Sequence, residues 1–520
     1  MSVELIRDLL RIDQMIGKNQ AQPLIDGKIT LPENKPEINK ILTIDGDVRI
    51  TGTNIIKDKI LINGAVDFKV LYDAEDEQQP IHSFKASKEF EEEIEIEGVN
   101  EQMIGDVKAH VEHIDYNLED RNVISVKTVI ELEGKVQAAS NIDIVKDIKG
   151  SQGVQVLKES IKYDDVVGIN SSSTLVKEAF EIDEDYPDIL DILRVDTKVY
   201  EREVKIVDNK VIVAGLAEYS IMYLGDDEES KINYIRHEIP FTHFVEVPGA
   251  TKEMMSRVKL EPGEVNYETR ENINGNMRII DVESTVDISA KVFEHNEKEV
   301  TVDTYSTNKK IDVKKQQIEV TENVGRNTAK EVINSTIEVS EESINNVYNL
   351  NVKPMLTDYR IIEEKVIVEG FLSTDMLYSG EDDEMKNMKQ EIPFKSYVDI
   401  EGIEDGMDSE IDMVLEDVRF NKSNEHEVEV TATVKLDVSV NSIKTISIVT
   451  EAEELQDNID KANRPSITIY IVQEEDTIWD IAKRYNTTVE ELVETNDIIN
   501  PDNIMPGEKI IIEKNIDFEF

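Results

Sequence analysis

The sequence predicts a mainly β protein in which three repeated antiparallel β-rich domains, each a sandwich or a partly open barrel, precede a small βααβ domain. Two observations predict this fold class. Apolar and polar residues alternate along three segments that align with one another, and such alternation is typical of half-buried strands. The last segment, from Tyr470 onward, instead shows helix-start signals between two short apolar runs.

A repeat of domain length organises most of the chain. The aligned segments are KDKILINGAVDFKVLYDAEDE from Lys57, DNKVIVAGLAEYSIMYLGDDEE from Asp208 and EEKVIVEGFLSTDMLYSGEDDE from Glu363. The equivalent residues are a first glycine (Gly64, Gly215, Gly370), a tyrosine (Tyr72, Tyr223, Tyr378) and a closing glycine (Gly98, Gly249, Gly402). A period of about 150 residues is that of a domain rather than of a solenoid unit. We therefore expect β domains at residues 1–150, 151–312 and 313–450.

Each copy is expected to contain one long strand with a single apolar face. The residues of that face are Ile60, Ile62, Val66, Phe68, Val70 and Tyr72 in the first copy; Val211, Val213, Ala217, Tyr219, Ile221 and Tyr223 in the second; and Val366, Val368, Leu372, Met376 and Tyr378 in the third. The glycine within the strand predicts a β-bulge or a close approach of another group to the backbone. Helices are expected to be few and short, as around residues 36–42.

An acidic tip follows the long strand in each copy, and a second strand-like run follows the tip. This order is typical of a β-hairpin. The tip sequences DAEDE, GDDEE and GEDDE lack the ligand spacing of a calcium-binding loop. A solvated loop that protects the hairpin from aggregation is therefore the preferred interpretation.

Composition limits the classes of function. The formal net charge of −54 disfavours nucleic acid and anionic membranes as partners. It either attracts a basic protein partner or serves solubility alone, and the charge by itself does not distinguish the two. The absence of cysteine excludes disulfides, thiolate zinc sites and a thiol nucleophile. Because the P-loop, nucleophile-elbow and zinc-protease motifs are also absent, we expect a non-enzymatic protein without catalytic residues, metal or cofactor. The N-terminal residues do not resemble a signal peptide, and no stretch reaches the roughly 18 apolar residues of a membrane span, so a cytosolic protein is expected.

The C-terminal segment YIVQEEDTIWDIAKRYNTTVEELVETNDIINPDNIMPGEKIIIEK predicts a strand, two helices and a second strand. The first helix is expected to be capped by Thr477 and to bury the stripe Ile478, Ile481, Ala482 and Tyr485. A capping box of Thr488 and Glu491 is expected to start the second helix. Asn496 is expected to end that helix in the left-handed conformation, and a turn at Pro506 and Gly507 leads into the last strand, residues 509–512.

These residues resemble the LysM domain, because Y-x-V-Q-x-x-D-T-I-W-x-I-A-x-x-Y is followed by N, P and I-x-P-G-x-x-I-x-I at the family spacing. The main departure is Glu475, which replaces a glycine of the family. The resemblance implies binding of glycans that contain N-acetylglucosamine. The implied groove has Glu475, Asp476, Thr477 and Ile478 on one side, and Ile499, Asn500, Pro501 and Ile504 on the other.

Trp479, the single tryptophan of the chain, is expected at the edge of the inward helix stripe. There it is either a partly exposed interface anchor or a seal of the small core. Asp476 and Asp480 flank it and are expected to pair with basic groups of a partner.

The order of domains resembles the SipL-like family of spore coat morphogenetic proteins of endospore-forming bacteria, in which SPOCS domains precede a LysM domain. The resemblance implies a mother-cell cytoplasmic protein at the forespore surface. It also implies binding of the coat-basement ATPase SpoIVA through the LysM domain, residues 466–514, with other coat proteins as further partners. The alternative is LysM-mediated binding of peptidoglycan at the spore cortex. Residues 451–465 are expected to form a flexible acidic tether between the two parts.

Overall fold

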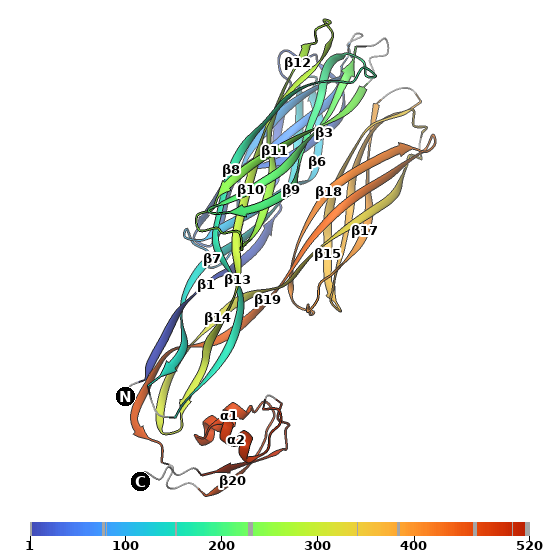
Figure 1. The fold of residues 1–520 in the computed structure, drawn as a ribbon. Helices are drawn as coiled ribbons and strands as arrows, with labels where there is room; N and C mark the ends of the chain where they lie inside the picture. Colours follow the sequence, from blue (N-terminus) through green and yellow to red (C-terminus); the bar gives the residue numbers. More distant parts are fainter. Residues whose placement is uncertain are drawn as a thin grey trace.

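The computed structural model describes residues 3–74, 79, 81–150, 153–226, 232–340, 342–381, 385–460, 465–501 and 503–514. Nineteen strands precede a C-terminal module that contains the two helices of the described residues (Figure 1). The predicted mainly β class is confirmed. Neither helix of the described ranges has the length and apolar character needed to cross a bilayer.

Each copy contributes six or seven strands. The first copy has β1 (Glu4–Ala21), β2 (Leu24–Thr30), β3 (Ile38–Ile56), β4 (Lys59–Ala74), β5 (Ile81–Glu95), β6 (Ile104–Asp120) and β7 (Val123–Lys149). The second has β8 (Val154–Glu181), β9 (Ile189–Val207), β10 (Lys210–Gly225), β11 (Ile232–Glu246), β12 (Met255–Glu271) and β13 (Met277–Ser306). The third has β14 (Lys309–Glu338), β15 (Asn346–Ile362), β16 (Lys365–Ser379), β17 (Met385–Asp399), β18 (Asp408–Lys422) and β19 (Glu427–Asn458).

Two antiparallel sheets recur in every copy. One is a three-stranded meander: β3-β4-β5, β9-β10-β11 or β15-β16-β17. The other is centred on the last strand of the copy, with β7 between β1, β2 and β6, β13 between β8 and β12, and β19 between β14 and β18. Apolar side chains of both sheets form one core in each copy. The shared topology agrees with a duplicated domain.

The apolar faces predicted for the long strands are confirmed. Every predicted residue on β4, β10 and β16 is at most 5% exposed. The phenol groups at the strand ends are also held in equivalent ways. The hydroxyl of Tyr72 donates to the carbonyl of Pro36 at 2.9 Å, and that of Tyr223 donates to Pro187 at 3.1 Å. In the third copy the residue 36 positions before the tyrosine is Glu342, and there the Tyr378 hydroxyl donates to the Glu342 carboxylate at 2.9 Å.

The bulge expected at the first glycine of each copy is also confirmed. The pairing register shifts opposite Gly64, Gly215 and Gly370 in the three meanders. On the other neighbouring strand, the residues directly across from these glycines are Phe90, Phe241 and Phe394. Each aromatic ring lies where a Cβ atom would stand, so the position requires glycine because a ring covers the backbone.

Gly215→Ala is expected to destabilise the second copy by about 1–3 kcal/mol, because overpacking forces neighbours to move. The new Cβ would lie 2.8 Å from the Tyr200 carbonyl oxygen and against the Phe241 ring. Gly52→Ala is the matched control, since Gly52 also lies in a strand but has no atom within 4 Å of an added Cβ. Thermal unfolding followed by circular dichroism measures both. Equal melting temperatures for the two variants would contradict the packing argument.

Two expectations about secondary structure were wrong. Residues 36–42 are not helical, because β3 begins at Ile38 and pairs with β4 through Ile38 and Ile41. The tether was expected from residue 451, but β19 continues through Asn458 by pairing with the start of β14. The central residues of the acidic tips, 75–78, 227–231 and 382–384, lie outside the described residues.

A stalk joins the three copies. Parts of β1, β7, β8, β13, β14 and β19 extend beyond the domain bodies and run together (Figure 1). Its apolar residues are Leu10, Ile12, Ile144, Ile161, Tyr163, Val300, Ile318, Val320, Ile446 and Ile448. Each copy contributes side chains to this core, so the copies share hydrophobic stabilisation through the stalk. The boundary predicted at residue 150 follows the end of β7, whereas that at residue 312 falls within β14.

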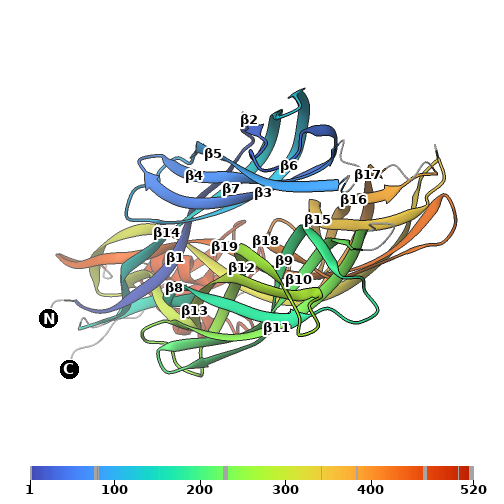
Figure 2. The same ribbon diagram turned by 90° about the horizontal axis from the view of Figure 1, so that it is seen from above.

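The meanders of the three copies also meet away from the stalk. Figure 2, seen from above, shows them around a common region. The side chains that form this contact are Leu42, Leu71, Leu193, Met222, Leu224, Leu377 and Met385. Leu71, Met222 and Leu377 occupy equivalent positions, each one residue before the tyrosine of its copy. Part of the outward face of each meander is therefore buried by the other copies.

Candidate binding module and its contact with the stalk

The C-terminal module consists of β20 (Ile467–Ile471), α1 (Ile478–Tyr485), α2 (Val489–Thr495) and β21 (Lys509–Glu513), with β20 antiparallel to β21. Both predicted helix starts are confirmed. The Thr477 side chain accepts from the Asp480 backbone N–H, and Thr488 and Glu491 form the reciprocal capping box. These caps satisfy backbone donors that have no partner within the helix.

The predicted end of α2 was wrong in its geometry. Asn496 has φ −111° and is therefore not left-handed; the left-handed cap is Asn486, at the end of α1 with φ 49°. The Asn496 side chain instead bonds the backbone of Ile511, donating at 2.8 Å and accepting at 2.7 Å. Asn496 thus links α2 to the outer edge of β21. This side-chain contact with a strand takes the place of the expected left-handed cap.

The inward stripe of α1 is largely as predicted. Ile478, Ile481 and Ala482 are buried, whereas Tyr485 is only partly buried. Leu492, Ile510 and Ile512 complete the core of the module. Because Ile478 belongs to this core, it does not present its side chain to a ligand in the way expected for a groove residue.

Trp479 does not form an exposed anchor. It is 8% exposed and packs edge-to-face on Tyr305, near the end of β13, with ring centroids 4.9 Å apart. Its indole N–H donates to the buried carboxylate of Asp303 at 2.8 Å. Trp479 is therefore neither an exposed interface anchor nor a residue of the module's core alone. Its side chain is buried between the module and the stalk.

Asp303 is the centre of this contact, which we name the docking contact (Asp303, Tyr305, Lys315, Trp479 and Lys483). Lys483 of α1 approaches the carboxylate at 2.7 Å, and Lys315 of β14 approaches it at 3.0 Å. Beside it, the Tyr305 hydroxyl donates to the Thr487 carbonyl at 2.7 Å. A carboxylate that is 7% exposed is thus satisfied by two ammonium groups and one indole.

Burial alone would raise the pKa of Asp303, but the hydrogen bonds from Lys483, Trp479 and Lys315 outweigh it, so the pKa lies below its ordinary value of 3.8. Since the docked form has the depressed pKa, this carboxylate stabilises docking above pH 3.8. Its contribution is lost as the pH falls through the docked pKa.

The remaining groove residues divide into accessible and internal ones. Glu475, Thr477, Asp480, Ile499 and Asn500 are exposed, while Pro501 and Ile504 are partly buried. Asp476 is internal: it accepts from the Tyr470 hydroxyl at 2.6 Å and from the Gln473 N–H at 2.9 Å. Asp476 therefore organises the loop before α1. Its carboxylate was expected to pair with a partner, but it bonds to groups of the module itself.

The backbone conformation at Glu475 explains why the LysM family usually has glycine at this position. Its φ is +68°, in the left-handed region that side chains disfavour by about 1–2 kcal/mol. A glycine adopts this conformation without a Cβ penalty. In this chain the backbone of the loop keeps the glycine-like geometry and carries an additional exposed carboxylate at the predicted groove.

Comparison with known proteins agrees with this anatomy. Residues 37–119, 188–270 and 343–423 match the family model described as SipL, SPOCS domain, and residues 470–513 match the LysM domain. Each SPOCS match spans a meander and the strand after it, β3–β6, β9–β12 or β15–β18. The strands that form the stalk lie outside the matches.

A curated protein, the cortical fragment-lytic enzyme of Bacillus subtilis (strain 168), is 46% identical over 44 residues, which are 8% of this chain. The chain spans 10% of the length of that enzyme. No solved structure matches the chain.

SPOCS and LysM domains are non-catalytic binding domains, so the fold and the module define a modular binding protein. Its three SPOCS domains followed by one LysM domain give the chain a SipL-like architecture.

Proposed function

We propose that the chain is a non-enzymatic scaffold for spore coat assembly, located in the mother-cell cytoplasm at the forespore surface. Its LysM domain binds the coat-basement ATPase SpoIVA, and its SPOCS domains offer surfaces to other coat proteins. The observation that carries this proposal is the joint presence of three SPOCS domains and a C-terminal LysM domain in one chain.

The accessible side of the LysM groove supports a protein partner. Ile499 is 99% exposed and belongs to the same predicted groove as the carboxylate of Glu475. Asp480 adds a second exposed carboxylate close to Glu475 in the chain. An apolar side chain among acidic groups suits a basic surface with an apolar recess, because such a surface pairs with both. Ile499 thereby takes the anchor role that was expected of Trp479.

Ile499→Ser in the full chain is expected to weaken SpoIVA binding by about tenfold or more, since loss of an apolar interface anchor often costs 2 kcal/mol. Ile273→Ser is the matched control, because Ile273 is also fully exposed but lies between β12 and β13. Pull-down and titration with purified SpoIVA measure the effect. Equal affinities for the two variants would contradict the groove, and absence of binding by the unmodified chain would contradict the proposed partner.

The second candidate is LysM-mediated binding of peptidoglycan. The LysM match favours it, as does the name of the curated relative, a cortical fragment-lytic enzyme. Co-sedimentation of the full chain with purified peptidoglycan tests it. Saturable sedimentation that Ile499→Ser abolishes would support the glycan, whereas recovery of the chain in the supernatant would leave SpoIVA as the preferred partner.

A further inference from the structure

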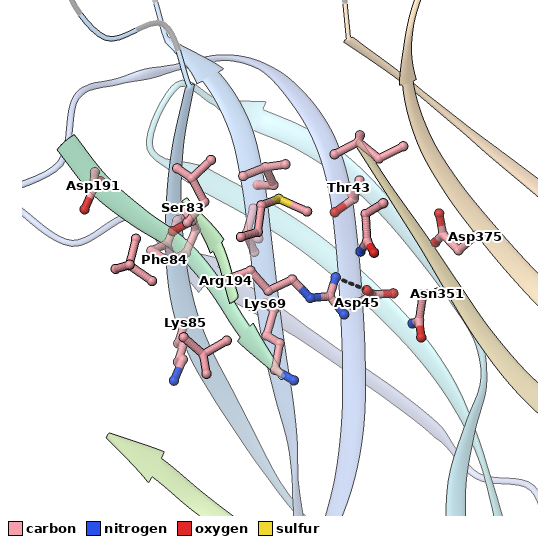
Figure 3. A pocket seen from close by; sticks show the side chains of 18 of the residues that line it. Thr43, Asp45, Lys69, Ser83, Phe84, Lys85, Asp191, Arg194, Asn351 and Asp375 are labelled. Atoms are coloured by element: carbon pink, nitrogen blue, oxygen red, sulfur yellow. Dashed lines mark hydrogen bonds and ion pairs between the residues drawn. The ribbon is translucent and has the colours of Figure 1, made fainter. Parts of the chain in front are cut away.

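A cavity of about 240 Å³ lies where the three copies meet, far from the LysM domain in the sequence (Figure 3). Its walls come from Lys35, β3, β4 and β5 of the first copy, β9, β10 and β12 of the second, and β15 and β16 of the third. The cavity is smaller than the roughly 300–1,000 Å³ of sites for drug-sized ligands. Its size therefore suits a small metabolite.

The copies contribute equivalent positions that differ in chemistry. On neighbouring strands of the meanders, Asp45 lies opposite Lys69, Asp196 lies opposite Ser220, and Asn351 lies opposite Asp375. One pair position thus holds an acid and a base in the first copy, an acid and a hydroxyl in the second, and an amide and an acid in the third. Side chains of different charge consequently face one another around the junction.

Most charges of the first two copies are compensated. Arg194 pairs with Asp45 (dashed line in Figure 3) and with Asp196. Lys69 approaches Asp196 at 2.8 Å and Asp47 at 3.0 Å. Of these groups, Asp45, Lys69 and Arg194 line the cavity, and their ion pairs leave them little free capacity for a ligand.

Two lining charges of opposite sign have weaker protein partners, and Figure 3 shows them on opposite sides of the cavity. Asp375 accepts a hydrogen bond from the Asn387 side chain, but its cation, Lys389, is 3.9 Å away and 60% exposed. Burial, followed by the nearby Asp45, raises the pKa of Asp375. Within the described part of the chain, no carboxylate lies within ion-pair distance of Lys85, whose ammonium donates to the Val265 carbonyl at 3.4 Å and lies 5.5 Å from the Tyr267 ring centroid.

Neutral polar groups accompany each charge. Asn349 and Asn351 come from the strand paired with that of Asp375, and Ser83 lies two residues before Lys85 on β5. The side chains of these three residues make no hydrogen bond to another described residue. A polar group that lines a cavity without a protein partner needs water or a ligand.

We propose that this junction cavity binds a small zwitterion, with its ammonium group at Asp375 and the asparagine amides and its carboxylate at Lys85 and Ser83. The separation of the two charges selects a molecule whose own charges lie at opposite ends, an ω-amino acid or a short peptide. The apolar lining residues Leu71, Met222 and Leu377 accommodate the connecting chain. Binding would bridge all three copies and stabilise the junction.

Isothermal titration of the full chain with 6-aminohexanoate and with glycylglycine tests the proposal, with hexanoate and hexylamine as singly charged probes. The expected result is saturable binding of at least one zwitterion, about tenfold or more tighter than either singly charged probe. Asp375→Asn and Lys85→Gln are each expected to weaken that binding about tenfold. The control Lys88→Gln changes an exposed lysine of the same strand outside the cavity and leaves binding unchanged.

Two results would overturn the proposal. One is the absence of saturable binding by both zwitterions, which would indicate a water-filled cavity. The other is binding that neither Asp375→Asn nor Lys85→Gln weakens, which would place the ligand elsewhere. Thermal unfolding of each variant without ligand distinguishes loss of the site from loss of the fold.

Discussion

Arg194→Leu is expected to lower the free energy of unfolding by about 3 kcal/mol, because it leaves Asp45 without its cation and leaves Asp196 with Lys69 alone. The Arg194 side chain is 15% exposed and pairs with Asp45 of the first copy and Asp196 of the second. The destabilisation comes from the carboxylates that lose this cation, and it does not measure the net free energy that the intact ion pairs contribute. Urea unfolding followed by circular dichroism is the measurement.

Arg49→Leu is the matched control for this prediction. Arg49 also pairs with an aspartate on a neighbouring strand, Asp67 at 2.7 Å, but both side chains are more than one third exposed. An exposed pair contributes about 0–1 kcal/mol, so the control is expected to unfold nearly like the unmodified chain. Similar losses for both variants would show that burial at the junction does not govern the effect.

Asp303→Ala is expected to release the LysM domain from the stalk by weakening docking about 2–4 kcal/mol. The change removes the acceptor of the Trp479 indole and the anion between Lys315 and Lys483. Because Trp479 is the single tryptophan, its fluorescence reports the docking contact directly. Emission at longer wavelength and stronger acrylamide quenching are expected, together with faster proteolysis between Asn458 and Ile467.

Glu299→Ala is the control on the same strand. Glu299 is exposed, and its ion pair with Lys158 is long, at 3.7 Å. It is expected to leave the emission unchanged. The unmodified chain should show the released spectrum when the pH falls through the depressed pKa of Asp303, whereas Asp303→Ala should already show it at neutral pH. A spectrum of Asp303→Ala identical to that of the unmodified chain would contradict docking through this carboxylate.

The docking contact changes the interpretation of the LysM domain. An independent module on a flexible tether would offer Trp479 to a partner, but the structure covers this residue with Tyr305 and Asp303. The accessible residues Glu475, Asp480 and Ile499 remain available on the docked domain. The proposed partner surface therefore does not include Trp479.

Local sequence determined much of this protein. Period-two alternation placed the buried faces of β4, β10 and β16, because successive side chains of a strand point to opposite sides. Side-chain chemistry within four residues determined the starts of α1 and α2, where Thr477 and Thr488 cap nearby N–H groups. The repeated glycine revealed both the duplication and the bulge, although the phenylalanine that covers it became evident only across the sheet.

Tertiary structure alone decided the stalk, the docking contact and the junction cavity. Trp479 and Asp303 are 176 residues apart, and nothing in the local pattern of either residue selects the other. The same applies to Arg194 and Asp45, which belong to different copies and meet only because the three meanders pack part of their outward faces together. Periodicity identifies which face of an element is buried, whereas the partner that buries it depends on how distant elements pack, and that packing decided which LysM residues remain accessible.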